Sequence, residues 1–122
     1  MTTAYSVTPF INVLVWVKKK ETEDGYDVHC EPNSLKVLQR DTVINYQIVD
    51  TYGQDIVFSG LEVKPEGQDQ LSNAAISVSG KQLTVSDANT QKCCLNLYLE
   101  FTDNTLSRSF IHDPQVHNET SQ

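Results

Sequence analysis

The sequence lacks the features that mark most enzymes and membrane proteins. It has no glycine-rich phosphate loop, no Ser-His-Asp spacing and no paired-carboxylate motif. Its longest apolar run, residues 13–17, is far too short to cross a bilayer. No segment shows helical periodicity across three turns. These absences predict a protein without catalytic residues, without a cofactor and without a membrane partner.

Cysteine and positive charge are also scarce. The three cysteines, Cys30, Cys93 and Cys94, form an odd count with an adjacent pair, which is a poor disulfide framework. Residues 1–8 have neither the basic start nor the apolar stretch of a signal peptide, so reduced thiols in a cytoplasmic protein are expected. Nine basic residues against sixteen acidic ones give a net charge of -7, which argues against nucleic acid as a partner.

What the sequence does contain is alternation. Leu95, Leu97, Leu99 and Phe101 are separated by single, mostly polar residues, which is the period of a half-buried strand. Comparable runs recur along the chain and are joined by short turns. Together they predict one all-β domain over residues 1–122, an antiparallel immunoglobulin-like β-sandwich of about 7–9 strands with Greek-key wiring. A closed barrel is the alternative.

Several local features of the strands follow from the same pattern. Residues 10–18 are apolar on both faces, which favours a central strand. Residues 35–38 suggest a short edge piece, and residues 65–73 form the longest polar connection. Between Phe58 and Leu61 the apolar positions change parity across Ser59-Gly60, which predicts a β-bulge.

Two hairpins are predicted from turn residues. Gly80-Lys81 fits a two-residue loop with glycine at its first position, and Asp103-Asn104 fits a second such loop. The expected cross-strand neighbours are Val78 with Leu83 in the first hairpin and Phe101 with Leu106 in the second.

One group of polar residues near the C-terminus is a candidate metal site. His112 and His117 lie on either side of a proline turn, with Asp113 between them, and His29 is the remaining imidazole of the chain. Imidazole and carboxylate are ligands that zinc, copper and nickel accept. A metal-binding protein is therefore one alternative function, against the simpler interpretation of a terminal turn.

The first strand also predicts an interface. Phe10, Leu14 and Trp16 lie opposite its valines, and a two-layer sandwich has only one core in which to bury side chains. A homodimer would cover this stripe, as would residues 65–73 or the N-terminal arm of a monomer. A weaker alternative is carbohydrate binding through Trp16 and Tyr98.

Several segments resemble one small bacterial family. They are Ile44-Asn45-Tyr46-Gln47-Ile48, Phe58-Ser59-Gly60-Leu61-Glu62-Val63, Ile76-Ser77-Val78-Ser79-Gly80-Lys81-Gln82-Leu83-Thr84-Val85-Ser86-Asp87 and Phe110-Ile111-His112-Asp113-Pro114-Gln115-Val116. Over about residues 40–120 the chain is similar to the DP-EP family, a label that fits Asp113-Pro114, whereas Glu119-Thr120 stands where Glu-Pro would follow. The resemblance implies a compact all-β protein of the bacterial cytosol and no particular activity.

Taken with the missing catalytic motifs, this resemblance favours a non-enzymatic binding or assembly module. Its expected partner is another protein or a second copy of the chain.

Overall fold

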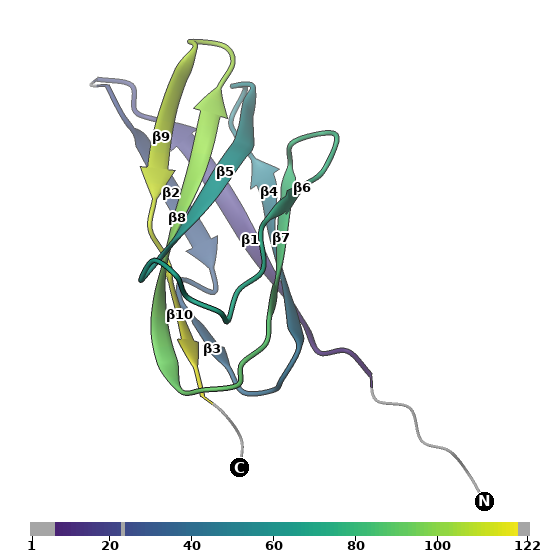
Figure 1. Ribbon diagram of the computed structural model, residues 1–122. Coiled ribbons are helices and arrows are strands. Elements are labelled where there is room, and N and C mark those ends of the chain that lie inside the picture. Colours follow the sequence, from purple (N-terminus) through teal and green to yellow (C-terminus); the bar gives the residue numbers. More distant parts are fainter. Residues whose placement is uncertain (1–6, 23, 120–122) are drawn as a thin grey trace, which may run out of the picture.

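The computed structural model describes residues 7–22 and 24–119, which hold ten strands and no helix (Figure 1). The all-β prediction is therefore confirmed. No helix in these ranges could cross a membrane. The strands are β1 (Phe10–Lys19), β2 (Tyr26–Glu31), β3 (Leu35–Val37), β4 (Thr42–Asp50), β5 (Ile56–Lys64), β6 (Ala75–Ile76), β7 (Gln82–Asp87), β8 (Cys93–Asp103), β9 (Arg108–His112) and β10 (Gln115–Asn118).

The strands form two sheets that share one core. Sheet A has the order β2-β1-β4-β7-β6, and sheet B has the order β3-β10-β8-β5 with β9 also paired to β8. Neither sheet closes on itself. Strand β8 contributes Leu95, Leu97, Leu99 and Phe101 to the core, all at most 1% exposed, as their alternation predicts. Sheet A contributes Val13, Val15, Val17, Ile44, Tyr46, Leu83 and Val85.

Both sheets are mixed rather than purely antiparallel, which corrects the sequence-based prediction. β1 runs parallel to β4, and β3 runs parallel to β10. The chain leaves sheet A after β2, forms β3 in sheet B and then returns as β4. A strand that returns from the other sheet need not reverse direction relative to β1, unlike a strand joined by a hairpin. As predicted, β1 lies inside its sheet, between β2 and β4.

The predicted bulge is present, but the first predicted hairpin register is wrong. The pairing of β5 with β8 shifts between Phe58 and Gly60. In the hairpin, Leu83 faces Ile76 rather than Val78, which is fully exposed at the tip of a longer loop. The hydroxyl of Ser77 stabilises that loop by accepting the amide of Gln82 at 3.1 Å. Serine hydroxyls that bond nearby backbone groups therefore favour the wider turn.

The second hairpin also differs from its predicted register. Phe101 faces Phe110 rather than Leu106, and Asp103 faces Arg108 across a loop of residues 104–107. Asp103 is fully buried and accepts the amide of Thr105 at 2.9 Å. Its carboxylate therefore holds it as the last residue of β8 instead of the first residue of the turn.

A buried polar cluster joins the two sheets at one end. Asp87 Oδ1 accepts hydrogen bonds from Asn118 Nδ2 at 2.8 Å and from the amide of Asn89 at 3.0 Å. Asn89 Nδ2 in turn donates to the carbonyl of Val37 at 3.1 Å. These contacts connect β7 of sheet A to β10 and β3 of sheet B. Burial raises the pKa of Asp87, while the bonds from Asn118 and Asn89 oppose that shift.

Candidate functional site: an open groove between two sheet edges

The two lateral sides of the sheet pair are built differently, and side chains close the side formed by β2 and β9. The rings of Tyr26 and Phe110 stack with their centroids 3.8 Å apart. Tyr26 OH donates to Asp103 Oδ2 at 2.7 Å, and Arg108 Nη1 donates to Asp24 Oδ1 at 3.1 Å. Residues far apart in sequence thus fix β2 of sheet A to the β8–β9 hairpin of sheet B.

The hydrogen bond between Tyr26 and Asp103 on this closed side shifts the pKa of both residues. Burial, together with the hydrogen bond to Asp103, raises the pKa of Tyr26 to about 12. Burial acts to raise the pKa of Asp103 as well, but the bonds from Tyr26, Gln54 and the backbone outweigh it and lower that pKa. The carboxylate therefore stays ionised beside a neutral phenol at physiological pH, which stabilises this side of the fold.

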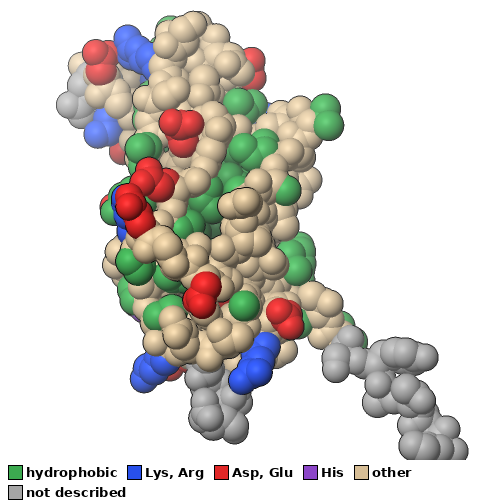
Figure 2. Space-filling view, in the orientation of Figure 1, with side chains coloured by type: hydrophobic (Ala, Val, Ile, Leu, Met, Phe, Trp, Pro, Cys, Tyr) green, Lys and Arg blue, Asp and Glu red, His purple; other side chains and the backbone are tan. Residues whose placement is uncertain are grey.

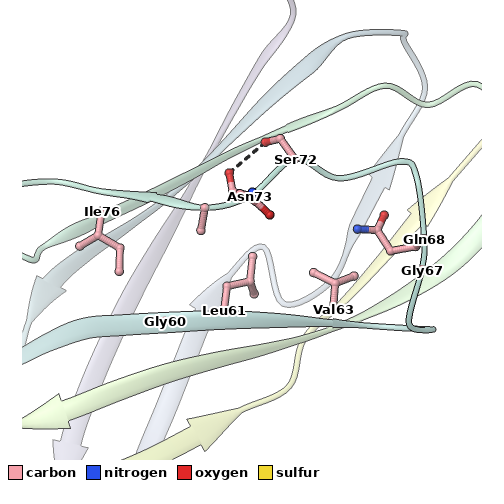
Figure 3. A pocket seen from close by; sticks show the side chains of 9 residues that line it. Gly60, Leu61, Val63, Gly67, Gln68, Ser72, Asn73 and Ile76 are labelled. Carbon is pink, nitrogen blue, oxygen red and sulfur yellow. Dashed lines mark hydrogen bonds between the residues drawn. The ribbon is translucent and has the colours of Figure 1, made fainter.

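The opposite side is open. Here β5 at the edge of sheet B and β6 at the edge of sheet A border a groove of about 310 Å³ (Figure 3). Leu61 and Val63 point into it from β5, while Asn73 and Ile76 lie on the facing wall and Gln68 lies at one end. Figure 2 shows hydrophobic side chains gathered in this hollow, with acidic side chains beside it. The edges of β5 and β6 therefore border a concave surface between the two sheets.

The floor of the groove consists of apolar side chains at the edge of the core that remain partly exposed to solvent. Leu61, Val63 and Ala74 are partly buried and pack against the core cluster, and Ile76 is 40% exposed. A segment that entered the groove would cover apolar surface continuous with the core. Such burial is favourable by about 25 cal/mol per Å² of apolar area removed from water.

The wall that faces β5 is anchored rather than loose. Leu71 is buried and forms a bridge with Asp87, and the amide of Ser72 donates to the carbonyl of Ser86 at 2.9 Å. Gln68 Oε1 accepts the amide of Leu71 at 2.7 Å, which closes the turn at the end of the groove. This connection contains no helix, in agreement with its polar sequence. Contacts within the protein therefore hold this wall of the groove in place.

Only the first part of the outer edge of β5 is occupied. The amide of Phe58 donates to the carbonyl of Gly80 at 2.8 Å, so it points away from β8. Beyond the bulge the parity changes, and the backbone groups that point away from β8 become those of Leu61 and Val63. In the described residues, no strand pairs with this second part of the edge. Its amides and carbonyls open onto the groove.

Exposed charges border this open edge. Lys64 Nζ lies 2.9 Å from Glu62 Oε1 and 2.7 Å from Glu66 Oε1. The hydrogen bonds to Glu66 and Glu62 hold the pKa of Lys64 well above its usual value, and the bond from Lys64 lowers the pKa of Glu66. The one lysine of this border is thus already shared between two carboxylates.

The four predicted metal ligands do not converge. His112 faces Leu99, whose side chain points into the core, whereas His117 faces Cys94 on the outer surface. The two imidazoles therefore lie on opposite faces of sheet B. His29 lies on sheet A, where its Nε2 is 2.9 Å from Glu31 Oε1. Over residues 7–22 and 24–119 no three His, Cys, Asp or Glu residues are grouped to hold a metal ion.

The segment that carries Asp113 acts as a break within one continuous pairing. His112 faces Leu99 and Gln115 faces Asn96, so β9 and β10 follow β8 in the same register. Between them the carbonyl of Pro114 accepts the amide of Leu97 at 2.9 Å. Burial lowers the pKa of His112, and Asp113 opposes this shift. The Asp-Pro pair therefore interrupts the strand without displacing it.

The predicted interface stripe does lie on the outer face of sheet A. Phe10 is 61% exposed, but Leu14 and Trp16 are half-buried, and the Trp16 ring lies 5.6 Å from that of His29. Neighbouring side chains thus cover part of the stripe. Residues 67, 68, 72 and 73 of the long connection line the groove. Self-association through the stripe stays a prediction, which sedimentation of a Trp16→Ala variant would test.

The aromatic residues considered for sugar binding are separated. Trp16 lies on sheet A, whereas Tyr98 faces Glu62 on the outer surface of sheet B. They do not form a common platform.

Sequence reasoning identified the bulge and the polar connection that border the groove, but not the groove itself. The parity switch at Ser59-Gly60 was the available signal for an irregular strand. That β5 is an edge strand, with β6 across from it, follows from the sheet order, which the sequence pattern does not contain.

The fold and the groove together define a small all-β protein with a two-sheet core and an open edge along the second half of β5. The chain belongs to the DP-EP family, whose family model matches residues 9–120. This match extends the resemblance to include β1, β2 and β3. Curated proteins contain no detectable match to the sequence.

Proposed function

We propose that this protein is a non-enzymatic binding module of the bacterial cytosol that takes an extended segment of a protein partner into the groove. The segment would pair with β5 as an additional strand of sheet B. An immunoglobulin-like arrangement of the two sheets is part of the proposal and is supported by their shared core. The cytosolic setting is supported by three cysteines that are free of disulfides.

The observation that carries this proposal is the open part of the β5 edge, over residues 60–64. Unpaired strand edges offer a row of donors and acceptors to another chain. In strand addition the main-chain hydrogen bonds supply affinity, and alternate side chains enter pockets that supply specificity. Here both requirements are met at one place, because Leu61 and Val63 line the same groove onto which the edge opens.

The surroundings of this edge favour a single extended segment over a second folded copy. The bulge and the bond from Phe58 to Gly80 occupy the first part of the edge, and Pro65 follows its last residue. Bulges and prolines limit the pairing of one sheet edge with another. Since Asn73 and Ile76 lie on the facing wall, the space suits one strand between two walls.

Selection from a displayed library of linear peptides, each about a dozen residues long, tests this function. The full chain serves as the target. Asn73→Trp would fill the groove from its exposed wall, at a side chain that makes no hydrogen bond. Asn33→Trp makes the same change in the exposed turn between β2 and β3 and is the matched control.

We expect selected peptides to bind the wild type and Asn33→Trp equally, and to lose at least about tenfold in affinity for Asn73→Trp, which corresponds to about 1.4 kcal/mol. Failure to enrich any peptide would contradict the proposal, as would enriched peptides that bind Asn73→Trp as tightly as the wild type.

A further inference from the structure

The carboxylate of Glu100 lies close to Gly60 of β5, at the start of the groove. Glu100 of β8 faces Gly60 of β5 on the outer surface of sheet B. Its Oε1 would lie 3.2 Å from a Cβ atom placed on Gly60, and it accepts a hydrogen bond from Ser59 Oγ at 3.0 Å. The absence of a side chain at Gly60 therefore lets Glu100 extend across β5 toward the open edge.

This carboxylate lies in a second hollow that adjoins the groove. The hollow measures about 260 Å³ and is lined by Glu62, Tyr98, Glu100 and Ile111, and it shares Gly60 and Leu61 with the groove. Ile111 is 60% exposed, so the hollow presents apolar surface between its carboxylates. The two concave surfaces meet at the bulge, one on each side of β5.

The charges in this hollow are not balanced. Glu62 is paired with Lys64, whereas in the described part of the chain no cation forms an ion pair with Glu100. Its hydrogen bond from a serine hydroxyl leaves the negative charge in place. A second acidic side chain and the ring of Tyr98 lie in the same hollow. This arrangement is complementary to a cation, because carboxylates and the face of an aromatic ring both attract one.

Strand pairing determines which residue of a bound segment would meet this hollow. Side chains of an added strand alternate between the groove and the outer face of sheet B. The residue opposite Gly60 projects onto the outer face, as Glu100 does, and has no side chain next to it on β5. The nearest charged group across β5 is then the carboxylate of Glu100.

We propose that the segment bound by β5 carries a lysine or arginine at the position opposite Gly60, where the cationic group binds Glu100 beside Tyr98. The partner is thus an extended peptide segment with apolar residues toward the groove and a basic residue toward the outer face. This inference rests on the proposed function and specifies the chemistry of the partner.

The same displayed library tests this inference through the sequences that it yields. We expect enriched peptides to alternate apolar residues with a lysine or arginine at one fixed position. The strongest peptide and its analogue with that basic residue replaced by glutamine are then measured against the wild type and Glu100→Gln. Glu31→Gln removes an equal charge from the outer face of sheet A and is the matched control.

Replacing the basic residue should weaken binding to the wild type and to Glu31→Gln by about threefold to fivefold at low salt, as for a partly exposed ion pair. The same replacement should have no effect on binding to Glu100→Gln.

Peptides that depend on the groove but carry no preferred basic residue would overturn this inference while leaving the proposed function intact. An equal effect of the replacement in Glu100→Gln would overturn it too. Enriched peptides that ignore Asn73→Trp would instead overturn the proposed function, and with it this inference.

Discussion

Gly80→Ala should destabilise the protein strongly, because two separate requirements meet at this glycine. Its φ of 75° lies in the left-handed region that disfavours other residues. A Cβ atom on Gly80 would also lie 2.6 Å from Cβ and 2.7 Å from Cγ1 of Val57 on β5. The carbonyl of the same glycine accepts the amide of Phe58, so the loop cannot move away without losing that bond.

The expected magnitude is the sum of these two effects. A left-handed conformation costs an alanine about 1–2 kcal/mol. Overpacking against a neighbour that cannot move away costs about 1–3 kcal/mol. Gly80→Ala should therefore lower the free energy of unfolding by about 2–5 kcal/mol, a large part of the stability of a small domain.

Two further variants separate the backbone cost from the steric cost. Gly53 has a φ of 87° with nothing within 4 Å of its Cβ position, so Gly53→Ala should show the backbone cost alone, about 1–2 kcal/mol. In the double variant Gly80→Ala/Val57→Gly, both contacting atoms of Val57 are removed, and the loss should fall below the sum of the losses of Gly80→Ala and Val57→Gly.

Urea unfolding followed by the fluorescence of Trp16 measures Gly80→Ala, Gly53→Ala, Val57→Gly and the double variant, provided that the slopes of the transitions agree. A Gly80→Ala loss no greater than that of Gly53→Ala would refute the contact with Val57. The loop at Gly80 would then not pack closely against β5.

Three further predictions concern other parts of the molecule. In the free protein the amides of Leu61 and Val63 should exchange with solvent faster than those of β8, as measured by NMR; equal protection would contradict an open edge. Because burial raises the pKa of Asp87, its protonated form stabilises the fold at low pH, and this contribution falls as the pH rises through the folded pKa. Asp87→Asn should therefore gain stability relative to the wild type as the pH rises, and parallel unfolding curves across pH would refute this. Alkylation with mass analysis should modify exposed Cys94 in the native state and spare buried Cys30, whose pKa burial raises to about 11; native labelling of Cys30 would contradict its place in the core.

Strands were predictable from the sequence because their signal is local. The alternation in β8 reports directly which side chains enter the core, and the parity switch at Ser59-Gly60 reports the bulge. Pairing registers were harder to predict, because an apolar side chain is not always a core side chain. The pattern predicts that Val78 and Leu106 face inward, yet serine hydroxyls and the buried carboxylate of Asp103 lengthen both loops and expose these two side chains.

Relations between distant strands were not predictable from pattern. The parallel pairing of β1 with β4 depends on the excursion of the chain into the other sheet. Likewise, His112 and His117 are five residues apart in the sequence. The face of sheet B on which each imidazole lies depends on the pairing of β9 and β10 with β8 in one continuous register. The groove was not predictable for the same reason, because it lies between β5 at the edge of sheet B and β6 at the edge of sheet A.

The closed side of the fold has a consequence for synthesis. The hydroxyl of Tyr26 can donate to Asp103 only after the ribosome has added that residue, 77 positions later in the chain. Its ring can stack only after Phe110 has been added as well. At about 5–20 residues per second, a ribosome needs roughly 4–15 s to make that stretch. During this interval the apolar faces of β1 and β4 lack most of sheet B. The nascent chain therefore depends on its late C-terminal strands to become a folded protein, and truncation before β9 would leave that side without its closing residues.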